Sequence, residues 1–171
     1  PKMDVPPEYW SGKKKATWRA WAEYPYTIVR GDIPQNLMAT TLAANAFILT
    51  GDQHYRDWVF EYAGAWRDRM AANKGWIPSN VGLNGIVGED FDGKWTGGVW
   101  GWDCRQYGGW RILSRSLRSG FKNAVFLGGT GYIESLRNQG RLLIDTRIKT
   151  PEGLQFVNFY TDEGPEKKPL S

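Results

Sequence analysis

The stretch that decides the fold is residues 33–70, IPQNLMATTLAANAFILTGDQHYRDWVFEYAGAWRDRM. Its first half, from Ile33 to Gly51, contains no charged residue, yet its Asn, Gln and Thr side chains make it too polar for a membrane span. Pro34 and Gly51 are boundary signals for a helix, and apolar residues fall on every side of the helix between them. We therefore predict a helix of about four turns that is buried among other helices.

The second half of the same stretch predicts an amphipathic helix. Apolar and aromatic residues recur at three- and four-residue steps from Tyr55 to Met70, and charged residues occupy the other side. Asp52 is a suitable N-cap for this helix. Because the Gly51-Asp52 turn is short, we expect an antiparallel hairpin with the uncharged helix inside and the amphipathic helix outside.

The same pattern recurs further along the chain. A second predicted helix spans residues 110–126 and is followed by another over residues 132–145. Tyr55 and Tyr132 occupy matching places in the two outer helices, 77 positions apart. This spacing predicts a second hairpin of the same design.

A further match supports a repeat. Residues 75–78 follow the first hairpin and residues 153–156 follow the second, and each segment opens a loop of Gly, Asn and Asp. A helical hairpin cannot bury its inner helix alone, so a repeat of this kind implies neighbouring hairpins.

The uncharged inner helix, the Thr50-Gly51-Asp52 turn, the aromatic outer helix and the long loop before the next hairpin resemble the (α/α) toroid of six-hairpin glycosidases and related polysaccharide lyases. The resemblance covers about residues 33–160. It implies an all-α fold in which residues 1–171 form a single partial toroid domain, with one repeat over 33–110 and another over 111–160. It also implies a carbohydrate substrate, and a periplasmic or secreted location.

The loop between the hairpins is the candidate functional segment. From Asn73 to Trp110 the chain has 38 residues with ten Gly and five of its ten Trp, and a loop of that length in a helical domain is usually functional. Sugar rings stack their C–H faces on Trp, while their hydroxyls need polar partners. The alternative is that these Trp fill space between hairpins, as we expect for Trp76. The candidate substrate-binding residues are Trp95, Trp100, Trp102, Arg105, Tyr107, Trp110 and Arg111.

Carboxylates in this loop are the candidate catalytic groups. Glycoside hydrolysis needs a protonated acid and an ionised partner on either side of one bond. Asp103 is the first candidate, because residues just ahead of inner helices gather at one end of a toroid, and Asp92 is the second. For Asp90 and Asp92, a turn closed by Gly93 is the alternative that we favour. A lyase mechanism remains open, with Tyr107 as proton donor.

Four cations follow one face of the second predicted inner helix. They stand at steps of four, three and four residues, which are helical neighbours. If this face lines a cavity, it favours an acidic substrate such as a uronic-acid or sulfated glycan. The alternative is a solvated face. The residues are Arg111, Arg115, Arg118 and Lys122.

Composition excludes several other classes of protein. A single Cys104 and a single His54 leave no internal disulfide, no zinc site and no His pair, and we expect His54 to be a surface or capping residue. We predict no cofactor, and the Asn, Asp and Glu residues of segment 80–92 match no regular calcium spacing. The net charge of +4 comes largely from Lys13 to Lys15, and no RNA-binding motif accompanies it, so nucleic acid is not expected. A non-catalytic glycan-binding or helical-repeat module is the alternative of a different class.

Overall fold

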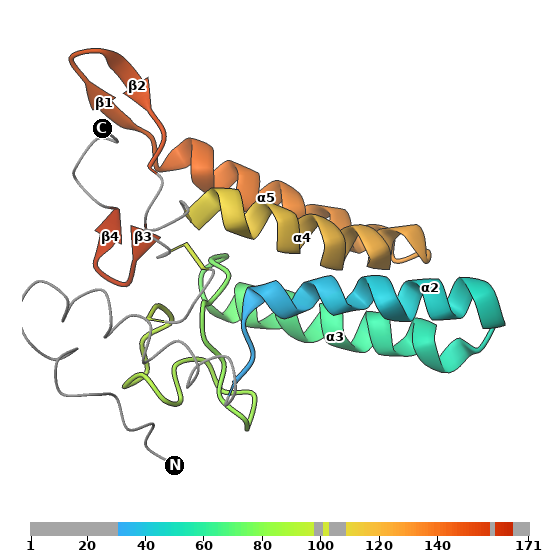
Figure 1. The fold of residues 1–171 in the computed structure, drawn as a ribbon. Coiled ribbons are helices and arrows are strands. Elements are labelled where there is room, and N and C mark those ends of the chain that lie inside the picture. The colour runs from blue at the N-terminus through green and yellow to red at the C-terminus, as the bar shows by residue number, and fades with distance from the viewer. Residues whose placement is uncertain (1–30, 98–100, 103–108, 158–159, 166–171) are drawn as a thin grey trace, which may run out of the picture.

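Two antiparallel helical hairpins, stacked on one another, form the main part of the molecule (Figure 1). The computed structural model describes residues 31–97, 101–102, 109–157 and 160–165, with residues 111 and 112 described by their backbone only. The first hairpin consists of η2 (Pro34–Ala39), α2 (Thr40–Thr50) and α3 (Gln53–Ala72). The second consists of α4 (Gly109–Phe126), η3 (Thr130–Tyr132) and α5 (Ile133–Asp145). The described part of the chain is therefore mostly helical, as predicted.

Two short antiparallel β-hairpins follow the helices. Strand β1 (Ile148–Thr150) pairs with β2 (Gly153–Gln155), and β3 (Tyr160–Thr161) pairs with β4 (Gly164–Pro165). The prediction that residues 153–156 repeat the loop at 75–78 is wrong, because Gly153 lies opposite Thr150 in a strand pair whereas Gly75 follows the end of α3. The prediction of an all-α fold is therefore wrong, because the structure contains these short strands.

The turn of the first hairpin is confirmed in detail. Gly51 has a left-handed backbone (φ 71°), which glycine adopts without a Cβ clash, and its N–H donates to the Phe47 carbonyl at 2.8 Å. The Asp52 carboxylate then accepts a hydrogen bond from the N–H of His54 at 3.0 Å and caps α3. Helix α2 therefore ends and α3 begins within two residues.

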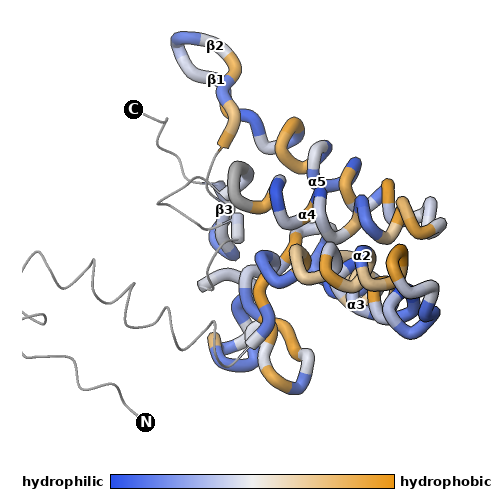
Figure 2. The backbone as a smooth tube through the Cα atoms, turned by 45° about the vertical axis from the view of Figure 1, so that its right-hand side comes forward, coloured by the Kyte–Doolittle hydropathy of each residue, from blue (hydrophilic) through white to orange (hydrophobic). Residues whose placement is uncertain are grey.

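Helix α4 is the centre of the core. It packs against η2, α2, α3 and α5, and its buried apolar residues recur at helical steps. Gly120 allows η2 to approach closely, since a Cβ there would lie 2.6 Å from Leu37 Cδ2. Figure 2 shows hydrophilic and hydrophobic bands alternating along α4 and α5, the pattern of amphipathic helices. The buried apolar side chains of α4 are those of Leu113, Leu117, Phe121 and Ala124.

Helix α2 does not lie inside the molecule, and this prediction is wrong. Only Thr40 and Ala44 are buried within it, while Leu42 is 75% and Leu49 84% exposed. The lack of charged residues in α2 predicts burial on all sides. Among the described residues, however, no helix covers its outer side. None of the helices among them is long and apolar enough to cross a membrane.

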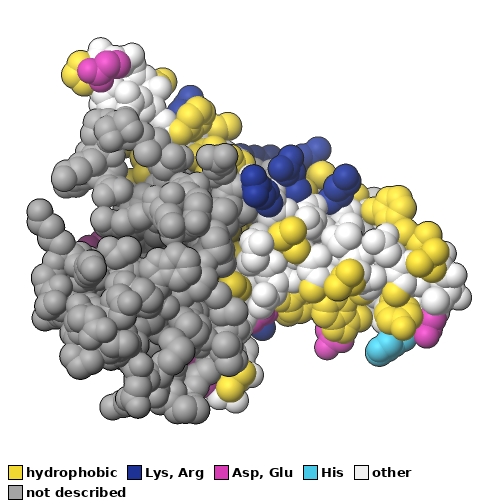
Figure 3. Space-filling model, viewed as in Figure 1, with side chains coloured by type: hydrophobic (Ala, Val, Ile, Leu, Met, Phe, Trp, Pro, Cys, Tyr) yellow, Lys and Arg dark blue, Asp and Glu magenta, His cyan; other side chains and the backbone are white. Residues whose placement is uncertain are grey.

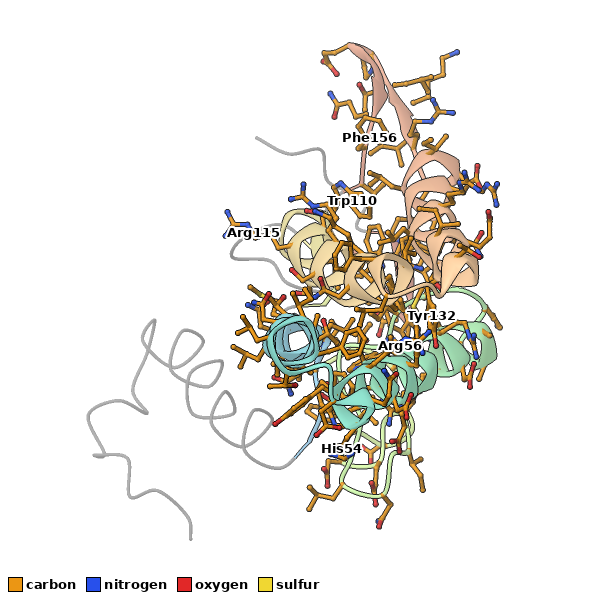
Figure 4. The ribbon with its side chains drawn as sticks, turned by 90° about the vertical axis from the view of Figure 1, so that its right-hand side faces the viewer. His54, Arg56, Trp110, Arg115, Tyr132 and Phe156 are labelled. Atoms are coloured by element: carbon orange, nitrogen blue, oxygen red, sulfur yellow. The ribbon has the colours of Figure 1, made fainter. Side chains whose placement is uncertain are left out.

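Polar contacts join the two hairpins near their turns. Arg56 donates from Nε to the Leu127 carbonyl at 3.2 Å, and Tyr132 donates from its hydroxyl to the Phe60 carbonyl at 3.0 Å. Figure 4 shows Arg56 and Tyr132 between the hairpins. Tyr55 and Tyr132 both lie at the start of their outer helices, but Tyr55 is exposed and makes no equivalent bridge in the described contacts.

Candidate functional site

Five aromatic side chains, which we call the aromatic cluster, gather where the loop meets the base of the hairpins. Trp76 lies at the centre, with its ring centroid 3.9 Å from that of Tyr160 and 5.9 Å from that of Trp95, both in stacked arrangements. The rings of Trp76 and Trp102 form a T-shaped pair with centroids 5.0 Å apart. The rings of Trp102 and Trp110 are stacked, with centroids 5.6 Å apart. The structure therefore brings Trp95, Trp102 and Trp110 together, as three of the predicted binding residues.

The loop that carries these rings is folded back on itself. The N–H of Ser79 donates to the Trp95 carbonyl at 2.9 Å, and the Asn80 amide donates to the carbonyls of Lys94 and Thr96 at 3.2 and 2.9 Å. Asn80 is buried, so its two bonds to backbone fix one limb of the loop against the other. The rings consequently sit on an ordered frame.

Asp162, in the turn between β3 and β4, holds the same loop from the other side. Its carboxylate accepts hydrogen bonds from the N–H groups of Trp95 and Thr96 at 3.0 and 3.1 Å, and also from the Thr96 hydroxyl. These donors occupy both carboxylate oxygens, which gives Asp162 an anchoring role. The sequence reasoning missed Asp162 and Tyr160, because their contacts with Trp95 and Trp76 join residues more than sixty positions apart.

Exposure divides the members of the aromatic cluster. Trp102 is 1% exposed, and its indole N–H donates to Gln139 Oε1 of α5 at 2.9 Å. Its ring is covered by protein, so in this structure it packs the core and offers no face to a ligand. Trp76, Trp95, Trp110 and Tyr160 are only partly buried. The part of the cluster that could meet a ligand consists of these four rings.

The predicted catalytic residues fall in different settings. Asp92 is exposed, has a left-handed backbone (φ 54°), and lies in a turn closed by the bond from Gly93 N–H to the Gly88 carbonyl. The turn that we favoured over catalysis for Asp90 and Asp92 is therefore present. Asp103 lies outside the described residues, as do Trp100, Arg105 and Tyr107.

The segment considered for calcium is closed by its own contacts. The Glu89 carboxylate accepts from the backbone N–H of Asn84 at 3.1 Å and from the Asn84 side-chain amide. No group of three or more His, Cys, Asp or Glu residues within the described ranges is arranged to hold a metal ion.

The cationic residues of α4 are on the surface of the structure. Arg115, Arg118 and Lys122 are all exposed, and Figure 4 shows Arg115 extending away from the bundle. The side chain of Arg111 is not among those described. In the described part of the chain, these cations therefore lie on a solvated face.

A second polar group, absent from the sequence reasoning, lies at the start of η2. Asp32 accepts hydrogen bonds from the hydroxyl of Tyr62 at 2.7 Å and the amide of Asn36 at 2.9 Å, and Arg69 Nη1 lies 3.6 Å from its other oxygen. Burial, and then the charge of Asp32, raise the pKa of the Tyr62 phenol well above its ordinary value. Tyr62 is thus a hydrogen-bond donor at neutral pH, and the group fastens η2 to α3.

Comparison with known families gives one result. A family model described as "Domain of unknown function (DUF8034)" matches residues 8–165. The chain belongs to this family. No curated protein and no solved structure gives a significant match to it. Membership in the DUF8034 family thus places the loop, the aromatic cluster and both hairpins within one family domain.

Proposed function

We propose that this chain is part of a glycoside hydrolase-like protein that binds an oligo- or polysaccharide at the aromatic cluster. The observation that carries the proposal is the run of stacked rings, Trp95, Trp76 and Tyr160, each only partly buried, on a loop held by Asp162. Partly exposed aromatic rings suit the C–H faces of sugars.

The division within the aromatic cluster supports binding over simple packing. Two Trp residues of this domain pack the core completely, since Trp66 is 0% and Trp102 is 1% exposed. Trp76, Trp95 and Trp110 instead keep part of their surface open although they touch the core. A bound sugar would cover that surface, which would explain why aromatic residues are found there.

Hydrolysis is assigned to Asp103, with Asp92 as its partner. Asp103 directly follows Trp102, whose carbonyl accepts a hydrogen bond from Tyr160 N–H at 3.0 Å, so it is attached to a fixed point of the aromatic cluster. Carboxyl groups about 5 Å apart would retain the anomeric configuration, whereas a separation of about 6.5–9.5 Å would invert it. The exposed turn of Asp92 favours one rival, a non-catalytic glycan-binding module that keeps the rings without an acid and base pair.

The binding step is tested with a panel of neutral and uronic-acid oligosaccharides, followed by tryptophan fluorescence and calorimetry. We expect Trp95→Ala to weaken binding by about five-fold or more, since stacking on one aromatic ring contributes on the order of 1 kcal/mol or more. Trp58→Ala is the matched control, because Trp58 is also partly buried and stacked on a tyrosine, but on α3. Equal binding by both variants would remove the aromatic cluster from consideration.

The chemical step is tested separately in the protein that contains this domain. Asp103→Asn and Asp92→Asn should abolish the release of reducing ends while leaving sugar binding intact. An absorbance increase from an unsaturated uronide, lost in Tyr107→Phe, would identify the lyase alternative instead. Binding without either product would leave the glycan-binding module.

A further inference from the structure

The outer side of η2 and α2 carries an apolar stripe. Met38 of η2 is 41% exposed, and Leu42 and Leu49 of α2 are 75% and 84% exposed. The spacing of seven residues places Leu42 and Leu49 on one side of α2. Ile48, which is 56% exposed, lies beside them. Asn45, which is also exposed, lies between Leu42 and Leu49 on this side. Exposed apolar side chains gathered on one side of a helix mark a site of association.

Charges of opposite sign border this apolar stripe. On one border, α4 presents Arg115, Arg118 and Lys122, and neither α2 nor α4 contains any Asp or Glu. On the other border, the N-cap Asp52 and Glu61 of α3 are exposed carboxylates. Figure 3 shows the two borders as Lys and Arg above the hydrophobic band and Asp, Glu and His below it.

We propose that this face binds the same face of a second copy of the chain, around a two-fold axis parallel to α2. Such an axis lays the apolar stripe of one copy on that of the other. It also brings the cationic α4 border of each copy opposite the acidic α3 border of its partner, twice over. A two-fold axis in the same interface but perpendicular to α2 would place the cationic borders of the two copies opposite each other. Electrostatics therefore favours the axis parallel to α2.

The same pattern disfavours the other surfaces that could cover the stripe. An anionic lipid surface would attract Arg115, Arg118 and Lys122, but it would repel Asp52 and Glu61 on the opposite border. Complementary borders on both sides of an apolar centre are what a self-complementary protein interface requires. The inference rests on residues outside the aromatic cluster and is independent of the proposed function.

The test is the mass of the 171-residue chain in solution, measured by sedimentation and light scattering over about a hundred-fold range of concentration. We expect a dimer that dissociates on dilution, and Leu42→Glu and Leu49→Glu should each raise its Kd by about ten-fold or more. Leu154→Glu is the matched control, because Leu154 is 65% exposed on the distant β2 strand. Circular dichroism verifies that the variants are folded.

A charge exchange tests the orientation. Lys122→Glu and Glu61→Lys should each weaken the dimer, and the double variant should regain most of the lost affinity, because both borders are then reversed together. A chain that is monomeric throughout overturns the proposal, and binding of that monomer to phosphatidylserine vesicles would assign the stripe to a lipid surface. A dimer that is unaffected by Leu42→Glu also overturns it, since another face would then hold the copies together.

Discussion

Helices α2 and α4 begin as the same prediction, an inner helix of a repeated hairpin, yet they occupy opposite environments. Helix α2 has no charged residue and exposes Leu42 and Leu49, whereas α4 carries exposed cations and completely buries Leu113 and Phe121. The difference follows from the order of residues around each helix. Helix α4 separates its apolar and charged sides, so one side can enter a core while the other meets water.

This comparison teaches that charge content and burial are separate properties. An uncharged helix with apolar residues on all sides can be covered only if neighbours exist on all sides. Among the described residues, helix α2 has neighbours in α3 and α4 on two sides, and its third side is open. The open side is the apolar stripe. Such a stripe is better explained by an interaction with a partner than by burial of α2 in the core.

The largest expected effect separates the two helices directly. Phe121→Ala in α4 should lower the free energy of unfolding by about 3–5 kcal/mol, because the ring is fully buried and leaves a cavity. Leu49→Ala in α2 should change it by about 0.5 kcal/mol or less. Urea denaturation in dilute solution, where copies are dissociated, measures both. Similar losses for the two variants would contradict the assignment of α2 to the surface.

A smaller effect contrasts two glycines in α4 and α5. Gly120→Ala should cost about 1–3 kcal/mol, since the new Cβ would lie 2.6 Å from Leu37 Cδ2 in a packed contact. Gly140→Ala meets nothing within 4 Å and should stabilise the protein by up to about 1 kcal/mol through helix propensity. Thermal unfolding of both variants gives the comparison, and a stabilising Gly120→Ala would show that η2 does not approach α4 so closely.

The smallest effect concerns the polar contact that fastens the α2 hairpin at its start. Tyr62→Phe removes a hydrogen bond to the Asp32 carboxylate, so we expect a loss of about 1–2 kcal/mol at neutral pH. Because the folded pKa of Tyr62 is raised above its unfolded value of about 10, its contribution is complete below that pH and is lost as the pH rises further. Unfolding of wild type and variant between neutral and alkaline pH measures this, and the variant should show the weaker alkaline dependence.

Local features of the fold were accessible from sequence. The Gly51-Asp52 turn, the amphipathic α3 and the helix that became α4 all rest on contacts within a few residues, which periodicity and capping rules describe. Strands β1 to β4 were missed because they are two or three residues long and have no detectable alternation. The exposure of Leu42 and Leu49 could not be predicted, because it depends on which helices surround α2.

The candidate site divides in the same way. The Gly- and Trp-rich loop was found from composition, and its Trp95, Trp102 and Trp110 do lie in one cluster. Their division into covered and open rings was not predictable, because Trp102 is covered by residues distant in sequence, such as Gln139 of α5, which accepts a hydrogen bond from its indole. Tyr160 carried no local signal, since its importance comes from a contact with Trp76 far back in the chain.

The bond between Asp162 and the loop at residues 95–96 has a consequence for the order of events during synthesis. Both helical hairpins are complete by Asp145, so the bundle can form while the rest of the chain is still being made. The ring of Trp76 gains its closest stacking partner only when Tyr160 has left the ribosome. The aromatic cluster can therefore be completed only after both helical hairpins have been synthesised.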